Sequence, residues 1–235
     1  MKRRILLAMA LAGFVGMAAQ ADLTVGVDSN AAWIGYMNVS DLPQNGGAYQ
    51  FGSSWGTADL TAVFSGSTLT LGPNTIGDPA AYWYTPSGGP GSVGNKIMDA
   101  SMYVEYGALP GQKLTFSGNV LSDTLTLLNN SSNYDANTNG WTAVAFVKDF
   151  ASDYSSFNVS TVPLAPGAFS VSLDTVNDPT RHVQYGFEVI GPDVWATDVG
   201  PYGTVQIQAI PEPATIGLIG IFGAGLLVFR RKFKI

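Results

Sequence analysis

Apolar and polar residues alternate along several stretches of the central part of the chain. The sequence FSVSLD at 169–174 places Phe, Val and Leu on one side of an extended strand and polar side chains on the other. Residues 183–189 and 204–209 repeat this alternation. A period of two residues is typical of a β-strand that buries one face. We therefore expect each of these stretches to form a half-buried strand.

The remaining pattern predicts an all-β domain. Residues 141–147 are apolar on both faces, which is typical of a central strand. Further strands are expected at residues 32–39, 60–64, 68–71, 102–106, 113–117 and 124–128. The segments between them are rich in Gly, Pro, Asn and Asp, which favour turns, and none keeps a helical period. About ten strands in residues 22–210 predict a single, jelly-roll-like β-sandwich.

The N-terminus has the pattern of an export signal. Lys2, Arg3 and Arg4 precede an uncharged, apolar run at residues 5–19. Ala19 and Ala21 then fit the small-x-small rule for signal-peptide cleavage. The alternative is a membrane anchor, for which the apolar run is short. We expect residues 1–21 to form a signal helix that is removed, which leaves residues 22–210 as an exported domain.

The C-terminus carries a second apolar segment. Residues 214–229 contain no charge, and four basic residues follow at positions 230, 231, 232 and 234. A helix of that length would be about 24 Å long, whereas the hydrocarbon core of a bilayer is about 30 Å thick. We therefore expect a transmembrane helix that is marginal as a permanent span, unless Arg230 and Arg231 snorkel. The positive-inside rule places its basic end in the cytoplasm and residues 22–210 outside.

The order of parts at the C-terminus resembles a known sorting signal. Three elements form residues 211–235, namely Pro211-Glu212-Pro213, the apolar segment, and Arg230-Arg231-Lys232. This order is similar to the PEP-CTERM signal of exported proteins in Gram-negative bacteria. The resemblance implies that an exosortase cleaves near the Pro-Glu-Pro motif. It also implies a transient anchor in the inner membrane, a final place at the cell surface or in the extracellular matrix, and a link to exopolysaccharide. The alternative is a permanently tail-anchored envelope protein.

Charge and composition narrow the classes of ligand. Residues 22–210 contain four basic and 16 acidic residues, a net charge of −12. Such a surface repels nucleic acids and anionic membranes, whereas neutral ligands and divalent cations are compatible with it. The chain has no cysteine and a single histidine, His182, which excludes disulfides, cysteine nucleophiles and His-rich metal sites. We expect no cofactor, apart from a structural calcium ion considered below.

Two patterns could indicate hydrolytic chemistry. The sequence GSSWG at 52–56 matches the nucleophile motif around Ser54, but the motif needs a strand-to-helix turn and a base, for which only His182 is available. We interpret it as a glycine-rich turn. Glu105 and Glu188, the two glutamates of the domain, could form the carboxylate pair of a glycosidase. The alternative interpretation is that both lie on solvated strand faces. We expect a non-enzymatic protein, with a carbohydrate-active enzyme as the alternative.

A polar loop resembles the start of a calcium-binding loop. Asp135, Asn137 and Asn139 alternate ahead of Gly140, as oxygen ligands do in an EF-hand. The twelfth position, however, is Phe146 rather than Glu. The alternative is an Asx- and Gly-rich turn that precedes a strand.

Aromatic residues near turns are candidates for sugar stacking. Tyr82, Trp83 and Tyr84 adjoin a Gly/Pro-rich loop, and Trp195 also lies near a turn. The alternative is that these aromatic residues belong to the core, as a stripe of aromatic residues more often does. We expect Trp141 to be a core residue. The segment 94–123 is similar to a segment of other exported PEP-CTERM proteins. That resemblance implies a sandwich like those of carbohydrate-binding modules, without an assigned ligand or site. For the whole protein we expect a structural or adhesive role linked to exopolysaccharide.

Overall fold

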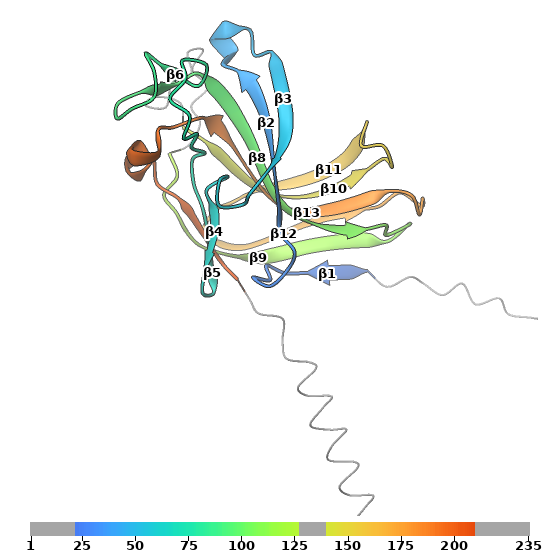
Figure 1. The fold of residues 1–235 in the computed structure, drawn as a ribbon. Helices are drawn as coiled ribbons and strands as arrows, with labels where there is room; N and C mark the ends of the chain where they lie inside the picture. The colour runs from blue at the N-terminus through green and yellow to red at the C-terminus, as the bar shows by residue number, and fades with distance from the viewer. Residues whose placement is uncertain (1–21, 127–139, 210–235) are drawn as a thin grey trace, which may run out of the picture.

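The computed structural model describes residues 22–126 and 140–209 (Figure 1). Several predicted features therefore lie outside the described residues. These are the cleavage residues Ala19 and Ala21, the loop residues Asp135, Asn137 and Asn139, and the sorting residues Pro211, Glu212, Pro213, Arg230, Arg231 and Lys232. The predicted N-terminal signal helix and C-terminal apolar helix are also outside them. Within the described ranges, no helix has the length and apolar character needed to cross a membrane.

Six strands form the first sheet. They are β1 (Leu23–Val25), β4 (Ala62–Ser65), β5 (Thr68–Leu71), β9 (Lys113–Asp123), β12 (Gly167–Asp174) and β14 (Val205–Gln208). The strand β9 lies at the centre of this sheet, because β12 pairs with one of its edges while β1 and β14 share the other. The strands β5 and β4 continue the sheet beyond β14. Only the β1–β9 pair of this sheet is parallel.

Six longer antiparallel strands form the second sheet. They are β2 (Ile34–Asp41), β3 (Tyr49–Trp55), β8 (Lys96–Gly107), β10 (Thr142–Phe150), β11 (Phe157–Pro163) and β13 (His182–Pro192). Their order is β11-β10-β13-β8-β2-β3, so β3 and β11 are the edges. A hairpin of β6 (Tyr84–Thr85) and β7 (Val93–Gly94) lies apart from both sheets (Figure 1). Three short 3-10 helices complete the described chain, namely η1 (Pro43–Asn45), η2 (Ala196–Asp198) and η3 (Gly200–Tyr202).

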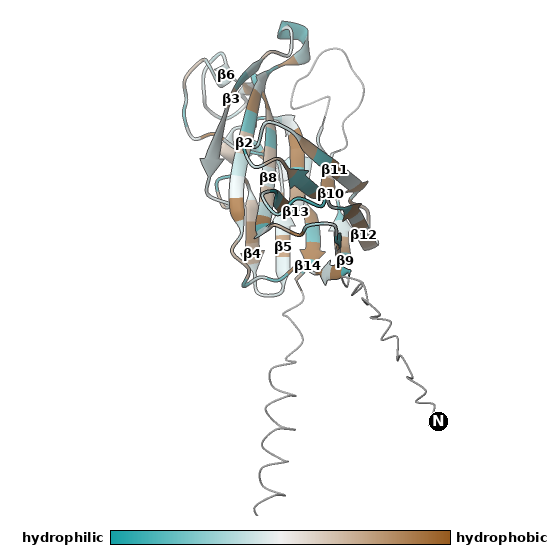
Figure 2. Cartoon of the chain, turned by 90° about the vertical axis from the view of Figure 1, so that its right-hand side faces the viewer, coloured by the Kyte–Doolittle hydropathy of each residue, from teal (hydrophilic) through white to brown (hydrophobic). Residues whose placement is uncertain are grey.

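Alternation along the strands places one face of each sheet in a common core. On β13, Val183, Tyr185, Phe187 and Val189 are all buried. The ring of Phe187 lies 5.2 Å from that of Phe116 on β9, so the two sheets meet at this point. A single cluster of buried apolar residues draws on both sheets. Burial of one such side chain contributes about 1.5–3 kcal/mol, which explains how the domain is stable without disulfides. Brown and paler bands alternate along the strands in Figure 2.

Most of the strands predicted from periodicity are confirmed, and two predictions are wrong. The stretches 169–174, 183–189 and 204–209 lie within or across β12, β13 and β14. Residues 124–126 are not a strand, because Thr124 bonds to Thr204 in the loop before β14. The GSSWG motif is not a turn, since residues 52–55 belong to β3.

The chain repeatedly crosses from one sheet to the other. It does so between β1 and β2, β3 and β4, β8 and β9, β9 and β10, β11 and β12, β12 and β13, and β13 and β14. Several neighbouring strands within a sheet are therefore distant in sequence, as β8 and β13 are. One face of the second sheet packs on the core. Its opposite face, built by six strands, carries the candidate site.

Candidate functional site

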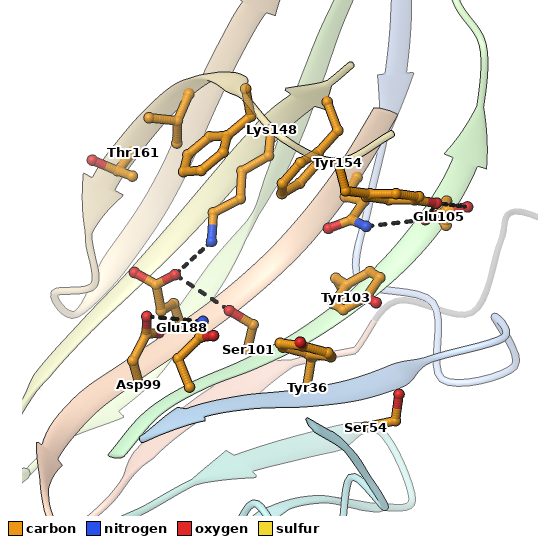
Figure 3. Close-up of a pocket in the computed structure, with 15 residues that line it drawn as sticks. Tyr36, Ser54, Asp99, Ser101, Tyr103, Glu105, Lys148, Tyr154, Thr161 and Glu188 are labelled. Atoms are coloured by element: carbon orange, nitrogen blue, oxygen red, sulfur yellow. Dashed lines mark hydrogen bonds and ion pairs between the residues drawn. The ribbon is translucent and has the colours of Figure 1, made fainter. Parts of the chain in front are cut away.

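The face of the second sheet that points away from the core forms a pocket of about 710 Å³ (Figure 3). We call it the outer-face pocket. Every strand of the sheet contributes to it, because each strand directs alternate residues to this side. Its lining consists of Tyr36, Asn38, Ser54, Asp99, Ser101, Tyr103, Glu105, Lys148, Phe150, Tyr154, Phe157, Val159, Thr161, Gln184 and Glu188.

The turn between β10 and β11 builds an aromatic wall at one side of the pocket. Asp153 Oδ1 accepts hydrogen bonds from the backbone and the hydroxyl of Ser155, which closes the turn. Tyr154 adopts φ 59°, a left-handed conformation that is uncommon for residues other than glycine. Its ring lies 5.6 Å from Phe150, which in turn lies 4.8 Å from Phe157. Tyr154 and Phe157 are about half exposed, so both offer ring surface to a ligand.

An ion pair occupies one end of the pocket. Lys148 Nζ lies 2.6 Å from Glu188 Oε2, and the Ser101 hydroxyl donates to the same oxygen at 3.2 Å. The ammonium group also lies 4.2 Å from the centre of the Phe146 ring, a cation–π contact. Both charged side chains are only 13% exposed, so the pair is shielded from solvent. Figure 3 shows the lysine reaching across from β10 to the carboxylate on β13.

Asp99 lies next to this ion pair. The Asn38 amide donates to its Oδ2 at 3.4 Å, and its Oδ1 has no hydrogen-bond partner within the described residues. Burial and the neighbouring charge of Glu188 raise the pKa of Asp99 to about 6, against the opposing effect of Lys148. The Asp99 carboxyl group therefore binds its proton more tightly than an exposed aspartate does.

A second polar cluster surrounds Glu105. Gln184 donates to its Oε2 at 3.0 Å, and the Tyr154 hydroxyl lies 3.2 Å from both of its oxygens. The imidazole Nδ1 of His182 lies 3.5 Å from Oε1, and its ring stacks on Tyr154 at 4.6 Å. Burial, and then the charge of Glu105, raise the pKa of Tyr103. The tyrosine rings of Tyr36 and Tyr103 are half-buried and lie between the two clusters (Figure 3).

The two glutamates considered as a glycosidase pair both reach the pocket, but far apart. Glu188 pairs with Ser101 across the β8–β13 ladder, and Glu105 lies four residues further along β8. Four residues span about 13 Å, beyond the roughly 5–9.5 Å between the carboxyls of glycosidases. Asp99 and Glu188 lie closer together, on the paired strands β8 and β13, but Glu188 already pairs with Lys148 at 2.6 Å and accepts a hydrogen bond from Ser101.

Ser54 also lines the pocket, yet it does not meet His182. It lies within β3 and pairs with Tyr36, whereas the nucleophile motif needs a strand-to-helix turn. The strands β8 and β2 separate β13 from β3, so about 14 Å lies between the two residues across the sheet. His182 contacts Glu105 instead.

None of the four aromatic residues predicted to stack on sugars lines the pocket. The prediction is wrong for Tyr84 and Trp83, which are 0% and 9% exposed. The Tyr84 hydroxyl donates to the Ile76 carbonyl and accepts from the Ile76 amide, and burial raises its pKa. Such a hydroxyl completes the interior hydrogen bonding. The ring of Tyr84 packs against Trp195, which is half-buried.

Tyr82 is 41% exposed, but its ring face is occupied. Lys96 Nζ lies 4.2 Å from the ring centre, and the Trp83 ring contacts it edge-on at 4.7 Å. By contrast, the prediction that Trp141 belongs to the core is confirmed, since it is 0% exposed and its indole donates to the Pro192 carbonyl.

The pocket residues that the sequence analysis missed include the tyrosines and phenylalanines of the outer face. The signal for them was present along β8, where Asp99, Ser101, Tyr103 and Glu105 alternate with buried residues. An alternating strand in which the polar face also carries an aromatic ring is a candidate binding surface.

Within the described ranges, no group of three or more Asp, Glu, His or Cys side chains could hold a metal ion. The predicted calcium ligands Asp135, Asn137 and Asn139 lie outside those ranges.

Comparison with known proteins gives no assignment for this site. The chain matches no protein-family model, no curated protein and no solved structure. The function therefore has to be argued from the outer-face pocket itself.

Proposed function

We propose that residues 22–210 form an exported domain that binds a neutral polysaccharide in the outer-face pocket. The observation that supports this most is the composition of that one pocket. Five aromatic rings and a set of amides, hydroxyls and carboxylates line a volume of about 710 Å³. We propose a structural or adhesive role for the protein, linked to exopolysaccharide.

The chemistry of a sugar ring fits this lining. A pyranose has an apolar face that packs on aromatic rings and a rim of hydroxyls that both donate and accept hydrogen bonds. Tyr154 and Phe157 are half exposed and supply ring faces. Asn38, Gln184 and Glu105 supply donors and acceptors close by. A pocket that extends over six strands is also long enough to accept several units of a chain.

The charges of the pocket favour a neutral polymer over an acidic one. Asp99, Glu105 and Glu188 line it against a single lysine, Lys148, which already pairs with Glu188. The exported domain as a whole carries a net charge of −12. A polymer rich in uronic acid, sulfate or phosphate would meet repulsion at every approach.

We further propose that the domain is a jelly-roll-like sandwich delivered by its two terminal signals. Crossing of the chain between two facing sheets supports that fold class. The resemblance of residues 211–235 to a PEP-CTERM signal supports sorting by an exosortase, after a transient stay in the inner membrane. The protein would then reside at the cell surface or in the extracellular matrix.

The proposal is tested by affinity electrophoresis against a panel of neutral and acidic polysaccharides, with the host's own exopolysaccharide included. Phe157→Ala and Tyr154→Ala remove exposed rings of the pocket. Tyr106→Ala is the matched control, because Tyr106 and Tyr154 are both 47% exposed and Tyr106 is not part of the pocket.

We expect retardation by at least one neutral polymer, weakened about tenfold by each pocket variant and unchanged by Tyr106→Ala. Equal weakening by all three variants, or binding only to acidic polymers, would overturn the proposal. Failure of every polymer to bind would do the same.

A further inference from the structure

His182 lies beside the outer-face pocket without being part of its lining. Val183 and Tyr185 are buried in the core, so the alternate residues His182 and Gln184 lie on the outer face of the second sheet. The pairing of β13 with β8 shifts register between Val183 and Gln184. A β-bulge of this kind redirects side chains, and such bulges are common next to functional sites. On either side of it, His182 and Gln184 both contact Glu105.

Tyr154 is the ring that this arrangement supports. It lies in the turn between β10 and β11, adopts φ 59° and is 47% exposed. A half-exposed ring on a turn has several rotamers open to it, and a ligand loses affinity when it has to select one of them. A ring that is already fixed in the free protein avoids this loss. The orientation of Tyr154 before binding therefore affects the affinity of the outer-face pocket.

Contacts with three strands fix the Tyr154 ring. The imidazole of His182 on β13 stacks on it, with 4.6 Å between the ring centres and 15° between the ring planes. The ring of Phe150 on β10 lies 5.6 Å away at an angle of 48°. The Tyr154 hydroxyl donates to Glu105 on β8 and lies 3.2 Å from each carboxylate oxygen. The stack fixes the plane of the ring, and the hydrogen bond fixes the direction in which it points.

Glu105 is itself held in place, so the hydroxyl has a fixed acceptor. Gln184 donates to Glu105 Oε2 at 3.0 Å, and His182 Nδ1 lies 3.5 Å from Oε1. Burial and then the charge of Glu105 raise the pKa of Tyr154, so its hydroxyl retains the proton that it donates. His182 thus contacts both the Tyr154 ring and the carboxylate that accepts from its hydroxyl.

We propose that His182 is a positioning residue of the outer-face pocket, which holds the Tyr154 ring in the orientation that stacks on a sugar ring. This inference rests on the proposed binding of a polysaccharide. The imidazole covers one face of the Tyr154 ring, so a sugar has to pack on the opposite face. His182 therefore acts through Tyr154 and makes no contact of its own with the ligand.

The role is tested by affinity electrophoresis of the exported domain with a neutral polysaccharide that retards the wild type. We expect His182→Ala to weaken binding about three- to tenfold, because the released ring has to be ordered when the ligand binds. His182→Phe keeps a flat ring against Tyr154 and should bind within about twofold of the wild type. The double variant His182→Ala, Tyr154→Ala should bind as Tyr154→Ala alone does, since His182 acts only through that ring.

Proton NMR of the untagged domain measures the stack without any ligand and without a change at His182. His182 is the only histidine of the chain, so its imidazole gives a single set of signals. The ring current of the stacked tyrosine shifts these signals upfield. We expect Tyr154→Ala to abolish this shift and Tyr106→Ala to leave it unchanged, because Tyr106 is equally exposed and is not part of the pocket.

The outcomes separate this role from the proposed function. If the polysaccharide binds wild type and His182→Ala equally, the positioning role is overturned and the binding function stands. An equal loss in His182→Phe and His182→Ala, a further loss in the double variant, or imidazole signals that do not respond to Tyr154→Ala would also overturn the role. If no polymer retards the wild type, the proposed function fails, and the role of His182 in it fails too.

Discussion

Asp99, Glu188 and Lys148 form a group of neighbouring charged residues in the outer-face pocket. One lysine neutralises one carboxylate, and the second carboxyl group lies next to that pair with only an amide from Asn38 on its Oδ2. The protonation state of Asp99 therefore depends on neighbours from three strands. Two measurable consequences follow. One concerns how stability depends on pH, and the other concerns what the ion pair contributes to the free energy of unfolding.

The raised pKa of Asp99 makes the native state less stable as pH increases. Its pKa rises from 3.8 to about 6, so the folded protein binds this proton more tightly than the unfolded chain. The stabilisation is complete below about pH 4 and is lost as pH rises through 6, and a shift of two units corresponds to about 3 kcal/mol. We expect Asp99→Asn to be more stable than the wild type at pH 7, with the difference shrinking toward pH 4. Thermal unfolding across this range measures it.

The control for this experiment is Asp59→Asn, which alters an exposed carboxylate outside the pocket. The difference in Tm between this variant and the wild type should be the same at each pH. A Tm difference between Asp99→Asn and the wild type that does not change with pH would contradict the account of Asp99.

Removal of Lys148 leaves a shielded carboxylate without its cation. We expect Lys148→Met to lower the free energy of unfolding by about 2–3 kcal/mol, because Glu188 is only 13% exposed. The double variant with Glu188→Gln should recover most of that loss. Urea unfolding of the single and double variants gives the coupling energy, and strictly additive losses would contradict a direct pair.

At the level of elements, the strands of the second sheet differ in pattern. Buried and exposed residues alternate along the central strands, whereas the edge strands lack this alternation. The strand β13 has a buried residue at each inward position, and its period of two residues predicted it. The edge strands β3 and β11 are exposed along most of their length, so they lack that signal. Sequence patterns detect a strand through its buried face, which is why both edges were missed.

The candidate site was only partly predictable for a related reason. Glu105 and Glu188 were singled out and do line the pocket, because charged residues in an alternating strand point away from the core. The rings of Tyr84 and Trp83 were misassigned, since a turn-rich neighbourhood does not reveal that a loop folds back over the core. Which strands lie side by side depends on pairings distant in sequence, such as β8 with β13, and no local pattern encodes them.

A glycine in the middle of β13 permits the close contact between β13 and β8. A Cβ at Gly186 would collide with the Met102 carbonyl oxygen and the backbone of Tyr103. We expect Gly186→Ala to lower the free energy of unfolding by about 2–3 kcal/mol. Gly77→Ala is the matched control, because nothing lies within 4 Å of its added Cβ, and it should be nearly neutral. Similar urea midpoints for the two variants would be inconsistent with the observed packing.

At the scale of the whole molecule, the chain has an acidic β domain between two apolar segments. The domain has a buried apolar core and no disulfides. In an exported protein, packing alone must then supply the stability that disulfides often provide. The sorting proposal concerns the terminal segments, and the binding proposal concerns the domain. They can therefore be tested separately.

Processing is tested by the intact mass of the protein recovered from the cell surface or culture medium. We expect a chain that begins at Asp22 and ends near Pro213, because the proposed sorting removes both the signal peptide and the apolar tail. Deletion of the exosortase should leave the tail attached and the protein in the membrane. A mature surface protein that retains residues 214–235 would contradict sorting by cleavage and favour a permanent anchor.

The central claim is that the outer-face pocket binds a neutral polysaccharide. The location of the binding site can be measured directly by NMR. Backbone amide NMR shifts of the exported domain are recorded during titration with a neutral oligosaccharide that retards it in electrophoresis. The account predicts that the largest changes map to Tyr103, Tyr154 and Phe157 and their neighbours on β8, β10 and β11. Changes concentrated at residues 80–95, or spread without preference over the surface, would contradict it.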